Sequence, residues 1–170
     1  MGLKVVHESS GIECAVPLDW QVDASHPDMV MAIEAERAAY PRGLNAWSGA
    51  LEAPVAVFRA NLVLTVVNNA ELTFGQWQRA SDHLLPIALK DYELLDVQKV
   101  RLAGRPGGRR LARHLSTSGE VLVMQQWFTV CGHLGVTLTA TCDVGSYLLL
   151  LPQMQTAAVS LTLPRDAGPN

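Results

Sequence analysis

Five arginines between residues 101 and 113 form the densest group of side chains that could do chemistry. A guanidinium group binds a carboxylate or a phosphate through paired hydrogen bonds, so this group could be a basic docking patch. Arginines on a hairpin rim can also form a solvated edge that prevents pairing with another strand. We favour the solvated edge and keep the docking patch as the alternative. The five residues are Arg101, Arg105, Arg109, Arg110 and Arg113.

The other residue types that commonly perform catalysis are scattered along the chain. The five histidines never have the spacing that places two metal ligands on one helix or hairpin. Ser48 and Ser146 lack the glycine-flanked context that holds a nucleophile at a strand-to-helix turn. The run from Gly104 to Arg110 lacks the ending of a phosphate-binding loop. We therefore expect no catalytic residue, no metal and no cofactor, and we expect the protein not to be an enzyme.

The three cysteines do not form a metal or redox motif. Cys14, Cys131 and Cys142 lie too far apart in the sequence for the close spacing of such sites, and an odd number cannot all pair. Cys131 and Cys142 fall on neighbouring predicted strands, but counting from the turn at Gly132 to Gly135 places them out of register for a disulfide. The sequence therefore predicts three reduced, mostly buried thiols.

One long segment without a regular period carries a tryptophan. Residues 44–54 follow a turn-forming run and have neither helical nor strand spacing, so we expect a loop. An aromatic side chain partly exposed on such a loop is a common recognition anchor. A tryptophan folded back over the sheet is the favoured alternative. The candidate anchor is Trp47, together with Tyr40, Leu44 and Leu51.

The elements that must position these residues are mainly strands. Residues 92–142 contain four strand-like runs joined by turns rich in glycine, which predicts an antiparallel meander. Residues 4–8 and 12–16 predict a hairpin, and residues 28–34 predict another strand. Residues 55–67 are so rich in valine and leucine that they predict a central strand with cover on both faces.

Two helices supply that cover. Thr73 and Gln76 have the spacing of a capping box, which predicts a helix from about Phe74. Pro86 predicts that this helix kinks or ends around Leu85. A second helix is expected to end at about Ser160 and to start at either Ser146 or Pro152. A layered arrangement of helices and an antiparallel sheet is favoured over a sandwich of two sheets.

Composition limits the class of protein. The chain has 170 residues, of which 49% are hydrophobic and 17% charged, so we expect one folded domain over residues 1–164 and a disordered tail at 165–170. The net charge of −3 gives no general attraction for nucleic acid or anionic lipid. The longest apolar run, Tyr147 to Leu151, is far shorter than the roughly 20 residues that cross a bilayer.

Six segments recur in an order that is typical of one family: Val16 to Trp20, Phe58 to Leu64, Leu102 to Gly108, Gln125 to Trp127, Thr137 to Thr141 and Ser160 to Leu161. This order resembles the Mog1/PsbP-like proteins, and within them the bacterial LpqN/LpqT and DcrB-like branch. The resemblance implies an α/β/α sandwich with a central antiparallel sheet, no shared catalytic residues, and action by binding other proteins. Many LpqN-like members have a signal and an acylated cysteine, whereas no apolar segment precedes Cys14 here, so we expect a cytoplasmic protein.

These features together predict a non-enzymatic adaptor that binds a protein partner, and a homodimer stays open. One alternative is a carrier of a small apolar ligand in a cleft lined by Met29, Met31, Trp47 and Met154. A hydrolase is a weaker alternative, because no polar cluster supports it. The predicted partner-binding residues are Tyr40, Leu44, Trp47, Leu51, Arg105, Arg109 and Arg110.

Overall fold

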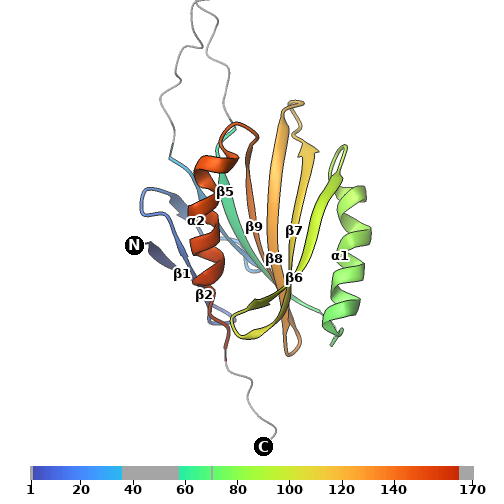
Figure 1. Ribbon diagram of the computed structural model, residues 1–170. Coiled ribbons are helices and arrows are strands. Elements are labelled where there is room, and N and C mark those ends of the chain that lie inside the picture. The colour runs from blue at the N-terminus through green and yellow to red at the C-terminus, as the bar shows by residue number, and fades with distance from the viewer. Residues whose placement is uncertain (1, 36–57, 70, 165–170) are drawn as a thin grey trace, which may run out of the picture.

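A seven-stranded antiparallel sheet separates two helices (Figure 1). The computed structural model describes residues 2–35, 58–69 and 71–164. A separate two-stranded hairpin lies beside the second helix. The elements are β1 Leu3–His7, β2 Ile12–Val16, β3 Gln21–Asp23, β4 Met29–Ile33, β5 Asn61–Asn68, α1 Phe74–Ala88, β6 Glu93–Leu102, β7 Arg105–Leu115, β8 Val121–Cys131, β9 Leu134–Asp143 and α2 Tyr147–Val159.

The strand order in the main sheet is β3-β4-β5-β9-β8-β7-β6, and every neighbouring pair is antiparallel. The predicted meander is confirmed as β6 to β9, and the predicted hairpin as β1 and β2. The strand predicted over residues 55–67 lies inside the sheet as β5, but it begins only at Asn61; residues 55–57 lie outside the described ranges. The short edge strand β3 was not predicted, because its three exposed residues carry no alternation.

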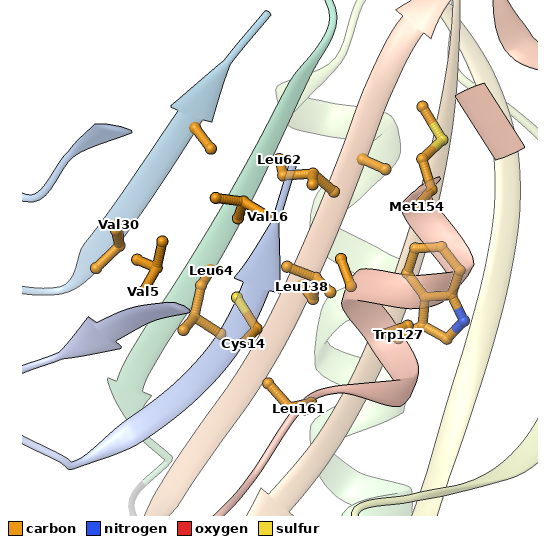
Figure 2. Packing of buried hydrophobic residues seen from close by; sticks show 14 of the residues in the cluster. Val5, Cys14, Val16, Val30, Leu62, Leu64, Trp127, Leu138, Met154 and Leu161 are labelled. Carbon is orange, nitrogen blue, oxygen red and sulfur yellow. The ribbon is translucent and has the colours of Figure 1, made fainter. Parts of the chain in front are cut away.

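One face of the sheet carries the apolar core. Leu62 and Leu64 of β5 and Leu138 of β9 are almost completely buried on this face, and α2 and the β1–β2 hairpin cover it. Figure 2 shows these side chains beside those that the covering elements contribute. A backbone bridge between Glu13 and Thr162 joins the hairpin to the segment after α2. The contributed side chains include Val5, Cys14, Val16, Met154 and Leu161.

The opposite face, under α1, packs through aromatic rings placed over glycines. A Cβ atom added at Gly135 would lie 2.4 Å from the Trp77 ring, and one at Gly108 would lie 2.2 Å from the Phe128 ring. Phe74 of α1 stacks on Phe128 with ring centroids 5.8 Å apart. The two glycines therefore let large rings approach the sheet where any other side chain would force them away.

Both helices begin as the sequence predicts, but both tolerate a proline. Thr73 caps α1 with the predicted box, and Ser146 precedes α2, the earlier of its two predicted starts. Of the two predictions for Pro86, a kink or an end around Leu85, the end is wrong, because Pro86 lies in the last turn and the helix continues to Ala88. Only the bond to the carbonyl four residues earlier is lost there, and the Leu89 amide closes the helix onto Leu85. In the described residues no helix is long and apolar enough to span a membrane.

Candidate functional site

The N-terminal end of α2 exposes three large apolar side chains. Leu148 is 76% exposed, Leu149 is 74% exposed and Val144, just before the helix, is 55% exposed. The sequence of α2 is apolar on all sides in its first turns, but only one stripe of a helix can face the sheet. Leu150 and Met154 occupy that stripe, so the neighbouring leucines point to solvent. We call Val144, Leu148 and Leu149 the α2 apolar end.

The end of β4 and the start of β5, between which segment 36–57 lies in the sequence, are at the same end of the sheet as the α2 apolar end. Asn61 at the start of β5 pairs with Thr141 near the end of β9, and β9 leads directly into α2. The Glu34 amide donates to the carbonyl of Ala60 at 2.8 Å, which fixes the end of β4 beside the start of β5. Figure 1 shows the start of β5 and the start of α2 at one end of the molecule. Tyr40, Leu44, Trp47 and Leu51 lie outside the described residues.

The arginines do not form one surface patch. Arg109 and Arg110 are adjacent on β7, so their side chains point to opposite faces of the sheet. Arg110 is fully buried under α1, and both readings of it as a surface residue, in a docking patch or on a solvated edge, are therefore wrong. Arg109 lies half-buried on the α2 side, 3.3 Å from the Asp96 carboxylate. Arg105 lies half-buried at the start of β7, opposite Leu102.

Arg110 instead joins α1 to the sheet. Its guanidinium forms an ion pair with Asp82 and donates to Gln126 Oε1 at 2.7 Å and to Ser81 Oγ at 3.2 Å. The same group lies 4.6 Å from the centroid of the Phe128 ring, in cation–π geometry. A buried charge needs such compensation, and here the partners come from both the helix and the sheet. We call this group the Arg110 clamp.

The prediction that Met29, Met31 and Met154 line one cleft for an apolar ligand is wrong. Met154 is buried under α2 on one face of the sheet. Met29 and Met31 pair with Thr65 and Val63 and lie on the opposite face, because Val30 between them points into the core. The sheet therefore separates the methionines that the prediction placed together.

The thiols and the buried histidine have structural surroundings. The prediction of reduced, buried cysteines is confirmed, since Cys14, Cys131 and Cys142 are all buried thiols outside any disulfide. Burial raises the pKa of Cys14 to about 11, so this thiol stays protonated and unreactive near neutral pH. His7 donates from Nε2 to the carbonyl of Pro27 at 2.8 Å, and its Nδ1 lies 2.8 Å from Ser10 Oγ. Among residues 2–35, 58–69 and 71–164, no group of His, Cys, Asp or Glu could hold a metal ion.

The α2 apolar end was missed by the sequence reading, although a signal was present. The run from Tyr147 to Leu151 is uniformly apolar, and its length was compared only with that of a membrane span. Five consecutive apolar residues in a helix cannot all face one side, so at least two must point away from the core. That argument needs only the helix assignment.

Comparison with known proteins identifies a fold. No protein-family model and no curated protein matches the sequence. LpqN of Mycobacterium tuberculosis, described as involved in cell envelope biogenesis, has a similar structure with a TM-score of 0.62 at 15% identity, over 96% of this chain and 91% of that chain. The Ran-binding protein Mog1p of Saccharomyces cerevisiae gives 0.62 at 9% identity, over 96% and 95%.

Cyanobacterial PsbP from Synechocystis sp. PCC 6803 gives a TM-score of 0.60 at 11% identity, over 95% of this chain and 92% of that chain. Identities this low establish the fold alone. The two helices and the seven-stranded antiparallel sheet occupy the same arrangement in these structures. The α/β/α sandwich that the resemblance implied is confirmed: the chain has the Mog1/PsbP-like fold.

Proposed function

We propose that the protein is a non-enzymatic adaptor domain that binds another protein through the α2 apolar end. The observation that carries the proposal is the exposure of Leu148 and Leu149, each about three-quarters in solvent on consecutive positions. Burying one leucine side chain stabilises a complex by roughly 1.5–3 kcal/mol. The partner therefore offers an apolar groove or pocket that accepts these two side chains together with Val144.

Two further observations support a binding role at this end. Segment 36–57, which contains Trp47, lies in the sequence between the end of β4 and the start of β5, and these two strand ends are at the same end of the sheet as the α2 apolar end. Mog1p, which has the same fold, is a Ran-binding protein, so the fold is used elsewhere to bind a protein. Tyr40, Leu44, Trp47 and Leu51 remain candidate anchors on the sequence argument alone.

The test is a pair of matched double variants. Leu148→Ser with Leu149→Ser removes the α2 apolar end without touching the core, so the free energy of unfolding should change by no more than about 0.5 kcal/mol. Leu84→Ser with Ile87→Ser is the control, because these residues of α1 are also 59% and 73% exposed but lie on the other side of the sheet. Cross-linking and affinity purification from the source cells would compare both variants with the unmodified protein.

We expect the control to retain every partner of the unmodified protein and the α2 variant to lose at least one, which should then bind the purified protein directly. An unchanged set of partners in the α2 variant would contradict the proposal. Sedimentation velocity tests whether a second copy of this chain, and not another protein, binds the α2 apolar end. If the unmodified protein forms a dimer that only the α2 variant abolishes, a second copy covers this surface and the adaptor proposal is wrong.

A further inference from the structure

A cavity of about 420 Å³ lies between the C-terminal half of α2 and the strands β6 to β8. Gln155, Ala158 and Val159 of α2 form one wall, and the turn between β6 and β7 curls toward that end of the helix (Figure 1). Trp127 and Arg109 of the sheet line the opposite side. The volume is in the range of cavities that hold small molecules, and the site is at the other end of α2 from its apolar end.

Two side chains with hydrogen-bond donors, Arg109 and Gln125, line this cavity. The Arg109 side chain is 29% exposed; one terminal nitrogen contacts Asp96, while its Nε is buried with no hydrogen-bond partner. Gln125 is 2% exposed and uses its Oε1 to accept a bond of 3.0 Å from the Tyr147 hydroxyl. The Arg109 guanidinium and the side-chain amide of Gln125 therefore line one space, and the guanidinium carries a donor that no acceptor in the described residues satisfies.

The other lining residues are mostly apolar, and the polar exceptions are Arg101 of β6 and Gln155 of α2. Val100 and Leu102 of β6 and Ala158 of α2 line the cavity together with the Trp127 indole. Figure 2 shows the indole ring at the edge of the core, with its nitrogen on the side away from Leu138. The cavity thus combines a polar corner with walls suited to an aromatic or aliphatic group.

We propose that this cavity binds a small monocarboxylate that carries an apolar body. The carboxylate accepts hydrogen bonds from Arg109 and the Gln125 amide, which gives the guanidinium a charge-assisted contact. The apolar body packs on Trp127 and on the aliphatic wall. Asp96 neutralises part of the Arg109 charge and Arg101 adds a second positive charge to the lining, so the negative charge of one carboxylate is accommodated.

Phenylacetate and octanoate are the probes, and their neutral amides are the matched controls. Each would be titrated into the full chain while the Trp127 indole signal and the backbone amides of β6, β7 and α2 are followed by NMR. We expect saturable shifts for at least one carboxylate with a dissociation constant below about 1 mM, and binding of the corresponding amide that is weaker by about tenfold. No variant is needed for this comparison.

A second comparison tests the arginine. Arg109→Gln should weaken carboxylate binding by about tenfold and leave amide binding unchanged. Arg113→Gln is the control, since Arg113 lies on the same strand and face but is exposed, paired with Glu93 and outside the cavity. We expect that control to bind the carboxylate within about twofold of the unmodified protein.

Two results would overturn the proposal. One is the absence of saturable shifts in the cavity residues for both carboxylates up to about 10 mM. The other is equal affinity for carboxylate and amide in the unmodified protein, which would show that the polar corner does not recognise charge. Neither result depends on the folding of a variant or on the α2 apolar end.

Discussion

The two helices cover the same sheet in opposite ways. α2 is apolar and sinks Leu150, Met154, Ala157 and Ala158 into the core, whereas α1 has no buried residue among those described. α1 is held instead by the Arg110 clamp and by aromatic rings that need glycines beneath them. α2 is stabilised by the apolar area that it buries, which several kinds of apolar side chain can supply. α1 depends on a few contacts that each require one residue type.

This difference should also appear in the dynamics of the molecule. Segments with few buried apolar contacts open locally at a lower free energy than the core does. We therefore expect α1 to separate from the sheet without global unfolding, while α2 opens only when the core is lost.

The largest effect is expected from removing apolar volume under α2. Met154→Ala should lower the free energy of unfolding by about 3–4 kcal/mol, because this side chain is 1% exposed in the core. Urea denaturation measures the change, and exposed Gln153→Ala on the same helix is the control. A loss below about 1 kcal/mol would mean that α2 does not depend on burial.

Breaking the Arg110 clamp from the helix side should have the next largest effect. Asp82→Ala leaves the guanidinium of Arg110 buried without its carboxylate, and we expect a loss of about 2–3 kcal/mol, less than for a fully buried pair because Asp82 is 41% exposed. The neighbouring His83→Ala, which is exposed, should change stability little. Equal effects of the two substitutions in denaturation experiments would show that the clamp does not hold α1.

The glycine beneath α1 gives a third effect. Gly135→Ala places a Cβ against the Trp77 ring and should cost about 2 kcal/mol by overpacking. Gly75→Ala within α1 meets only the end of Arg79 at 3.9 Å and should be neutral or stabilise the protein by up to about 1 kcal/mol. Thermal melts of both variants measure the change in stability. An unchanged melting temperature for Gly135→Ala would contradict the close approach of the Trp77 ring to Gly135.

The smallest effect concerns a thiol on the α2 side. Burial raises the pKa of Cys14 from 9.0 to about 11, so the folded protein holds this proton more tightly than the unfolded chain does. The resulting stabilisation is complete below pH 9 and is lost as the pH rises through 9 toward 11.

Between pH 8 and pH 9.5 this thiol should therefore cost the unmodified protein about 1 kcal/mol of unfolding free energy that Cys14→Ala does not lose. Denaturation of both proteins at the two pH values gives the difference. Parallel pH dependence in the two proteins would show that Cys14 is not buried in an apolar environment.

Local patterns predicted most of the fold. The meander follows from alternation and from turn glycines at positive φ, such as Gly119 and Gly132, and the start of α1 follows from the Thr73 capping box. The sequence left two starts open for α2, Ser146 and Pro152, because a proline is expected in a first turn. Pro152 lies inside the helix, because the apolar stripe of Leu150 and Met154 keeps both halves of the helix on the core.

The functional residues were harder to predict, because they depend on which face each element covers. Adjacent positions on β7 had to send Arg109 and Arg110 to opposite faces, and that much was available from the strand assignment. The sequence did not show that α1 would bring Asp82 over Arg110, or that α2 would leave a cavity beside Arg109. Both depend on contacts between elements distant in sequence.

Native-state hydrogen exchange tests the distinction between the two helices most directly. The account predicts that amides of α1 exchange through local opening at a free energy at least about 2 kcal/mol below that of α2 and β8, and that Asp82→Ala lowers only the α1 value. If α1 and α2 exchange at the same free energy and Asp82→Ala lowers both equally, α1 is part of the global core and the account is contradicted.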